Sequence, residues 1–188
     1  MAASRSILRC SSRSVRRIVA AALAFGAAGA PAWGAAPDGK PRRIVSLNVC
    51  AGQILMDLVA PSRIQSVSFL AADPDYSNVA ARAAKLRLNR GRAEEIIPLD
   101  PDLILAGRYT AIPTVELLKR VGKRVVTVPL ATDIPGIRRA IRVVARAAGE
   151  EARGRAMIAR FDARLAAARP TGPARPVIAL YWPRGYTG

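Results

Sequence analysis

The chain has 188 residues, a formal net charge of +17 and no histidine, and aromatic residues make up 5% of it. The absence of histidine excludes a Ser-His-Asp triad, a Cys-His pair and the usual histidine-ligated zinc or manganese site. A positive charge this large suggests nucleic acid, but the arginines are dispersed and neither a Lys/Arg block nor an aromatic platform accompanies them. We therefore expect no nucleic-acid binding.

Residues 1–36 are expected to be a cleaved export signal. Five arginines and no acidic residue accompany an apolar core at residues 18–30, and small residues at 30–36 offer cleavage positions. A membrane anchor and an organellar transit peptide are the alternatives, and the pair Arg16-Arg17 leaves the general and twin-arginine export routes both open. Removing this segment leaves 25 basic and 13 acidic residues, a net charge of +12, and leaves Cys50 without an internal disulfide partner.

The rest of the chain alternates short apolar strands with helices. This alternation predicts an α/β fold in which a parallel sheet carries helices on both faces. The loop after the first strand is expected at residues 48–50. The predicted strands are residues 43–47, 64–69, 86–88, 103–106, 124–128 and 177–181. The predicted helices are an Ala-rich turn before residue 85, a short helix that begins near residue 93, and residues 51–60, 113–120, 132–148 and 150–169.

Residues 94–110 predict a ligand-binding site at one edge of the sheet. Asp100-Pro101-Asp102 is typical of a turn, because Asp side chains can bond nearby backbone N–H groups. Residues 103–106 are apolar without alternation, as in a strand covered on both faces. Gly107 permits a sharp turn, and residues 108–110 (Arg, Tyr, Thr) follow the carboxyl end of this strand, where open α/β sheets bind ligands.

The last third of the chain predicts the domain organisation. Residues 150–169 form one helix, about 30 Å long at about 1.5 Å per residue. The strand at 177–181 is followed by exposed aromatic residues and has no second domain to join. We expect an N-terminal lobe at residues 37–149, a long inter-lobe helix at 150–170, and at 171–188 only the first strand of a second α/β lobe. The chain is thus expected to be a fragment of a longer reading frame.

These segments together resemble a known family. The strand at 43–47 with its following helix, the stretch 94–107, residues 115–128 and the helix from Glu150 resemble the periplasmic solute-binding proteins of ABC importers for iron-siderophores, cobalamin and heme. The resemblance implies two α/β lobes joined by one rigid helix, with the ligand in the cleft between them. It implies a monomeric, non-enzymatic protein of the periplasm that hands its ligand to a permease and its ATPase.

The resemblance leaves the ligand open. We expect a ferric siderophore first, with cobalamin or heme as alternatives, and neither a resident cofactor nor a metal site in the protein itself. An α/β enzyme is the alternative from another class. Against it, the sequence has no Gly-x-Gly-x-x-Gly or Gly-x-x-x-x-Gly-Lys loop after the first strand and no Gly-x-Ser-x-Gly motif.

The resemblance also implies roles for individual residues. Ligand contacts in this class come from loops at the strand ends. An acidic side chain on each lobe docks to basic pockets of the permease, and Glu94, with Glu95 beside it, occupies that position in the N-terminal lobe. The positions in this sequence that match the ligand-contacting loops are Asn48, Cys50, Phe69, Tyr76, Arg90, Arg108, Tyr109, Thr132, Trp182, Arg184 and Tyr186.

Each role has a structural alternative. The three arginines can neutralise an anionic chelate or be solvated surface residues. Trp182 can stack on a macrocycle or pack between lobes. Cys50 is expected to be a small buried residue rather than a nucleophile, because no base is available to it. Glu94 can be an ordinary acid at a helix N-terminus.

Overall fold

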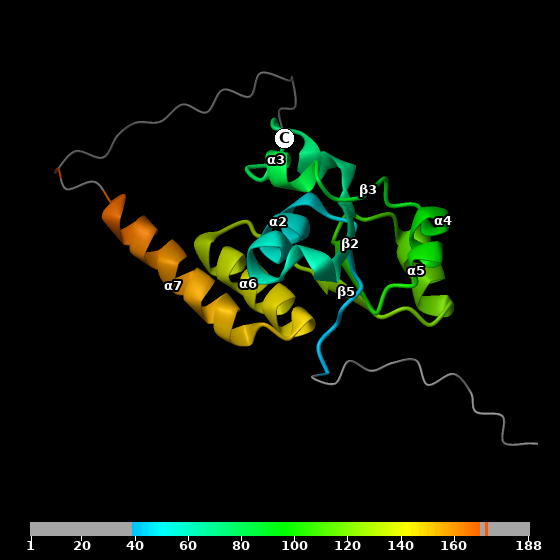
Figure 1. The fold of residues 1–188 in the computed structure, drawn as a ribbon. Helices are drawn as coiled ribbons and strands as arrows, with labels where there is room; N and C mark the ends of the chain where they lie inside the picture. Colours follow the sequence, from blue (N-terminus) through cyan, green and yellow to red (C-terminus); the bar gives the residue numbers. More distant parts are fainter. Residues whose placement is uncertain (1–38, 170–171, 173–188) are drawn as a thin grey trace, which may run out of the picture. The chain divides into compact units, whose positions relative to one another are not determined.

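The computed structural model describes residues 39–169 and residue 172. In this part of the chain a five-stranded, all-parallel sheet has the strand order β3-β2-β1-β4-β5 (Figure 1). The predicted parallel α/β sheet is therefore confirmed. The strands are β1 (Ile44–Ser46), β2 (Ile64–Ser68), β3 (Leu88–Asn89), β4 (Leu103–Gly107) and β5 (Val125–Val128).

Helices cover both faces of this sheet, as the alternating pattern predicts. Helices α2 and α6 pack on one face, and α4 and α5 pack on the other (Figure 1). Short 3₁₀ turns lie at Pro61–Arg63, Phe69–Ala72 and Ile97–Leu99. The helices are α2 (Val49–Leu58), α3 (Ala80–Ala83), α4 (Ala93–Ile96), α5 (Ile112–Arg120), α6 (Ile134–Ala148) and α7 (Glu151–Ala167).

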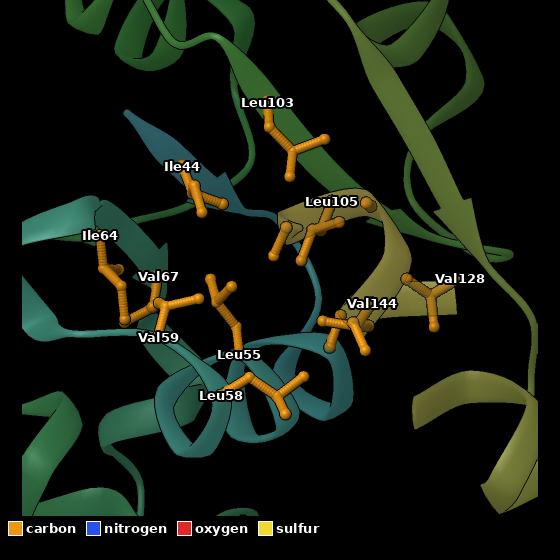
Figure 2. Close-up of a cluster of buried hydrophobic side chains, with 14 of the residues drawn as sticks. Ile44, Leu55, Leu58, Val59, Ile64, Val67, Leu103, Leu105, Val128 and Val144 are labelled. Carbon is orange, nitrogen blue, oxygen red and sulfur yellow. The ribbon is translucent and has the colours of Figure 1, made fainter. Parts of the chain in front are cut away.

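The two central strands are buried on both faces. Ile44 of β1 and Leu105 of β4 point towards Leu55 of α2 (Figure 2). The intervening residues Val45 and Ile104 point the other way, into the cluster formed with α4 and α5, and all five side chains are fully buried. Side chains alternate between the faces of a strand, so a strand covered on both faces is apolar at most positions, and the buried Ser46 is the polar exception in β1.

Three polar side chains fix the ends of these elements. The carboxylate of Asp102 accepts hydrogen bonds from the backbone N–H groups of Arg42 (2.6 Å) and Arg43 (3.0 Å). The Asp102 side chain therefore does bond backbone N–H groups, as predicted. These N–H groups belong to the residues just before β1 and not to the turn at residues 100–102. Asn48 caps α2 through Ala51 N (2.9 Å), and Asp133 caps α6 as its sequence position predicts.

Several element boundaries differ from the prediction. Helix α2 begins at Val49, two residues early, because the side chain of Asn48 caps it and draws residues 49 and 50 into its first turn. The predicted loop at 48–50 is therefore wrong. The third strand lies at Leu88–Asn89 rather than 86–88, since the buried amide of Asn89 donates hydrogen bonds to Ser46 O (3.2 Å) and Ser66 Oγ (2.7 Å).

Helix α7 lies along α6. Gly154 is its one buried residue, and a Cβ atom there would overlap the Cβ atom of Ala145 on α6. Nε of Arg138 on α6 donates a hydrogen bond of 2.9 Å to Asp162 of α7. The remaining surface of α7 is half-buried or exposed. Its predicted inter-lobe role stays a prediction, and the strand predicted at 177–181 lies outside the described residues. Within residues 39–169, no helix combines the length and apolarity needed to cross a membrane.

Candidate ligand-binding site

The candidate site lies between β1 and β4, two neighbouring strands whose following helices cover opposite faces of the sheet. Strand β1 sits between β2 and β4. The chain leaves β1 for α2 on one face of the sheet and leaves β4 for α5 on the other face. Diverging connections leave a crevice at the carboxyl ends of the two strands, which is the usual ligand position in open α/β sheets. Asn48 and Cys50 line one side of this crevice, and residues 107–109 line the other.

Asn48 and Gly107 are in close contact across the crevice. A Cβ atom on Gly107 would overlap the side-chain amide of Asn48, so this position accepts only glycine unless Asn48 moves. The backbone N–H of Gly107 donates to Oγ1 of Thr110 (2.9 Å), and the N–H of Thr110 donates to the carbonyl of Gly107 (3.1 Å). This turn presents Arg108 and Tyr109 at its tip.

These elements enclose a pocket of about 460 Å³ at the carboxyl edge of the sheet. A volume of this size suits a drug-sized or cofactor-sized molecule. The apolar part of its lining is Ile54, Val128, Pro129, Leu130, Ala131, Ile137 and Ala140, and the remaining lining residues are Asn48, Cys50, Gln53, Asn78, Gly107, Arg108 and Tyr109. The pocket therefore offers a mainly apolar surface with a few hydrogen-bonding groups.

The pocket rim carries a large exposed aromatic side chain and an arginine. Tyr109 is 80% exposed, and Leu130 across the rim is 50% exposed. Arg108 makes no hydrogen bond or ion pair with any residue that the structure describes. An aromatic face and an unpaired guanidinium can stack on and hydrogen-bond a planar anionic molecule.

The structure brings part of the predicted ligand set together. Asn48, Cys50, Arg108 and Tyr109 line the pocket, and Thr132 follows the lining residue Ala131. Phe69, Tyr76 and Arg90 lie in neighbouring segments beyond the lining, and Trp182, Arg184 and Tyr186 lie outside the described residues.

Phe69 and Arg90 interact with each other. The guanidinium carbon of Arg90 lies 5.0 Å from the centroid of the Phe69 ring, within the range of a cation–π contact. The pair joins the ends of β2 and β3. Since both side chains already have a partner, their contribution to ligand binding remains a prediction.

Cys50 differs from the expectation of a small buried residue. It is exposed, in the first turn of α2, and it lines the pocket. The reason is the cap at Asn48, which begins the helix early and turns position 50 outward. The expectation that Cys50 is buried is therefore wrong.

Sequence reasoning missed several lining residues. Gln53 and Ile54 follow Cys50 by three and four positions, so they share its face of α2, and this spacing was readable from the sequence. Asn78 had no such signal. Its backbone N–H donates to Oε1 of Gln53 (3.4 Å), and Nε2 of Gln53 donates to the carbonyl of Tyr76 (3.5 Å). These contacts join residues about 25 positions apart.

The two predicted docking acids have different surroundings. Glu94 lies in the first turn of α4, is exposed, and has no hydrogen-bond partner among residues 39–169. Glu95 is half-buried, and its Oε2 accepts a hydrogen bond of 2.7 Å from the backbone N–H of Arg90. Of these two acids, only Glu94 therefore has a carboxylate without a hydrogen-bond partner among the described residues.

Two carboxyl groups with lowered pKa values, those of Asp100 and Glu150, lie at the opposite, amino edge of the sheet. A hydrogen bond from Lys123 lowers the pKa of the Asp100 carboxyl. Burial opposes ionisation of Glu150, but hydrogen bonds and positive charge from Arg63 and Lys40 outweigh it, so the pKa of Glu150 is also lowered. These carboxylates belong to the scaffold and not to the pocket.

Comparison with known proteins gives consistent matches. The family model for periplasmic binding proteins matches residues 44–187. The chain is 28% identical over 154 residues to a cobalamin-binding protein of Halobacterium salinarum, covering 80% of this chain and 42% of that protein. The chain thus spans less than half the length of this curated relative.

Solved structures show the same fold. The periplasmic heme-binding protein RhuT from Roseiflexus sp. RS-1 is 26% identical, with a TM-score of 0.59 over 70% of this chain and 52% of that protein. The vitamin B12 binding protein BtuF of Vibrio cholerae is 22% identical, with a TM-score of 0.55 over 68% of this chain and 49% of that protein. Both proteins are named for the solute that they bind. Since the family model covers most of the chain, and the parallel sheet with its helices is consistent with that fold, the chain belongs to the periplasmic binding protein family.

Proposed function

We propose that this protein is the substrate-binding component of an ABC importer, located in the periplasm, and that it captures a metal chelate for delivery to a membrane permease. The observation that carries the proposal is the pocket at the carboxyl ends of β1 and β4, with its apolar lining and the uncommitted side chains of Arg108 and Tyr109. The chain spans about half the length of its matched relatives, so the described lobe supplies one wall of the proposed site.

The chemistry of this wall suits a large chelate. The apolar residues from β5, α2 and α6 can bury the hydrophobic surface of a macrocycle, and Tyr109 can stack on its face. Arg108 can form charge-assisted hydrogen bonds with a carboxylate or phosphate on the periphery of the ligand. A preformed pocket keeps the ordering cost of binding low, as capture at low ligand concentration requires.

The identity of the chelate is the finer part of the proposal. The ferric siderophore expected from the sequence remains a candidate. The mainly apolar lining supports a chelate with an extended hydrophobic surface, and the matched relatives are named for cobalamin and heme. We therefore place heme and cobalamin ahead of a hydrophilic ferric siderophore.

Delivery would use the same edge of the lobe as capture. Helix α4 follows the carboxyl end of β3, so Glu94 lies at the edge of the sheet that also carries the pocket. An exposed carboxylate without a partner among the described residues can pair with a basic pocket on a permease. The protein would act as a monomer in this role.

A binding panel tests the proposal. The 188-residue chain is titrated with hemin, cyanocobalamin and ferrichrome, with the metal-free ligands as controls, by calorimetry and by Soret absorption for heme. We expect saturable binding of one chelate with a Kd of about 10 μM or tighter, which corresponds to about −7 kcal/mol. The matched variants are Tyr109→Ala and Arg108→Gln, which weaken binding, and Arg120→Gln on the far side of the lobe, which does not. If no chelate binds, or if all three variants bind alike, the proposal is wrong.

A further inference from the structure

A second groove lies at the edge of the sheet, between β5 and α6. Its volume is about 470 Å³, and four arginines line it: Arg124 from the residue before β5, and Arg139, Arg142 and Arg146 from α6. Val126 and Val143 form an apolar floor between them. Pro129 and Ala147 complete the lining. We call the groove formed by these eight residues the arginine groove.

Regular geometry gathers these residues. Arg124 immediately precedes β5 and lies two positions before Val126 of that strand, so both side chains fall on the sheet face that α6 covers. Arg139, Arg142 and Arg146 follow one another at spacings of three and four, so they form one row along the helix. The other side of α6 buries Val144 and its neighbours against the sheet.

The positive charge of the arginine groove is largely uncompensated. The side chains of Arg124, Arg142 and Arg146 form no hydrogen bond or ion pair with the residues described by the structure. Arg139 has a long, exposed contact of 3.5 Å with Asp133. Arg142 and Arg146 also border a smaller hollow of about 180 Å³ that adds Arg155, with Glu151 as its acid. Clustered like charges do not stabilise a fold, so the cluster fits an anionic partner.

We propose that the arginine groove docks this protein onto the anionic phospholipid headgroups of a membrane. A guanidinium binds a phosphate through two parallel hydrogen bonds and is only weakly hydrated, so several arginines can engage several headgroups. Arg139 and Arg146 are seven residues apart on α6, which corresponds to about 10 Å. One free phosphate cannot reach both ends of this row, whereas a plane of headgroups can.

The lining of the groove favours a lipid surface over other polyanions. Its floor is aliphatic, and none of its lining residues is aromatic, so it has no stacking platform for nucleic-acid bases. Pro129 lines both the arginine groove and the ligand pocket, so docking through the groove would hold the pocket close to the membrane. The choice of a membrane, rather than a soluble acidic protein, rests on the proposed function beside a permease.

Vesicle binding of the full chain tests this docking. Flotation is measured with vesicles of phosphatidylcholine containing 30% phosphatidylglycerol and with pure phosphatidylcholine, at low and high salt. We expect binding only to the anionic vesicles, with an affinity that falls as salt rises. The double variant Arg142→Glu/Arg146→Glu should bind at least tenfold more weakly than wild type. The matched double variant Arg87→Glu/Arg120→Glu makes the same change in net charge at exposed sites elsewhere and should bind within about threefold of wild type.

A site-specific measurement separates the arginine groove from the basic segment at residues 1–36. Modification of single arginines by phenylglyoxal is followed by mass spectrometry. Anionic vesicles should slow the modification of Arg142 and Arg146 at least fivefold and leave Arg120 unchanged. Equal rates at all three positions, or equal vesicle binding by the two double variants, would overturn the proposal.

Two further protection measurements would reveal a partner other than a membrane. Protection by inorganic phosphate at the same phosphate concentration, without vesicles, would show a site for a free anion and overturn membrane docking. Protection by poly-glutamate but not by vesicles would point to an acidic protein and also overturn it. Chelate affinity is measured on the same variants and should be unchanged, because neither Arg142 nor Arg146 lines the ligand pocket. Failure of docking is thereby distinguished from failure of the proposed function.

Discussion

The carboxylate of Glu150 accepts a hydrogen bond of 2.5 Å from Nη1 of Arg63, a residue 87 positions earlier in the chain. Arg63 also donates to the carbonyl oxygens of Pro41 (2.8 Å) and Ala148 (2.6 Å), and Lys40 lies 3.2 Å from the same carboxylate. These contacts join the segment before β1, the start of β2 and the turn between α6 and α7. The position from which α7 departs is therefore held by the body of the lobe.

Replacing Arg63 with alanine should destabilise the lobe. The change removes three hydrogen bonds and leaves the carboxylate of Glu150, which is 12% exposed, with only Lys40. We expect the free energy of unfolding to fall by about 2–3 kcal/mol. Urea denaturation followed by circular dichroism measures it. The control is Arg82→Ala, which removes the exposed pair with Asp57 and should cost under about 1 kcal/mol. Equal losses in the two variants would contradict this view.

The same ion pair predicts how stability depends on pH. The pKa of Glu150 is lowered from its ordinary value of 4.5 in the folded protein. A lowered pKa means that the unfolded chain binds the proton more tightly, so the stabilisation is present above pH 4.5 and is lost as pH falls through the folded pKa. Denaturation at a series of pH values from 7 to 3 should show a shallower loss for Glu150→Gln than for wild type. An identical slope in the two proteins would exclude this contribution.

Gly107→Ala tests the contact between β4 and the cap of α2. The new methyl group would overlap the side chain of Asn48, so that residue must leave its place in the crevice. We expect a loss of about 1–3 kcal/mol in the free energy of unfolding and weaker chelate binding. Asn48→Ser keeps a capping hydroxyl but is shorter. The double variant should therefore recover most of the stability, and simple additivity of the two losses would contradict the proposed overlap.

Tyr109→Ala separates binding from stability. The side chain is 80% exposed, so its removal should change the free energy of unfolding by no more than about 0.5 kcal/mol. Chelate affinity should fall about tenfold, or about 1.4 kcal/mol, because a stacking surface at the pocket rim is lost. The comparison is Tyr76→Ala, whose side chain is outside the pocket lining, and which should lose less than about threefold. Equal losses would mean that the pocket extends beyond its described lining.

Glu94→Lys tests the proposed docking to the permease. Because Glu94 is exposed and has no hydrogen-bond partner in the described region, charge reversal should leave the fold and the chelate affinity unchanged. Uptake of the labelled chelate by cells that carry the importer should fall at least fivefold. Glu116→Lys, on the exposed surface of α5, is the control for added charge. A loss of chelate affinity in Glu94→Lys would argue against a docking role.

The local elements were readable from the sequence because their signals are local. Apolar runs marked the parallel strands, Asp133 marked the start of α6, and Gly149, with a φ of 71°, marked its end. The position of a site beyond β4 also followed from the sequence, since Gly107 and the polar residues after it form one continuous segment. The family resemblance came from the order of these same segments.

The side-chain environments of the site required the tertiary structure. Asn48 looked like a loop residue, but it caps α2 and contacts Gly107, and its cap turns Cys50 into the pocket. Phe69 and Arg90 both looked like ligand contacts, but their mutual contact depends on the parallel pairing of β2 and β3. Cross-strand neighbours of this kind are distant in sequence and leave no periodic signal.

The sequence by itself determined the α/β class, the edge of the sheet that carries the pocket, and a strongly basic chain with dispersed arginines. Only the tertiary structure showed that Arg124 meets the arginine row of α6 in one groove. The physical reason is that strand alternation and helical spacing fix the face on which each side chain lies, whereas the packing of α6 beside β5 decides which faces meet.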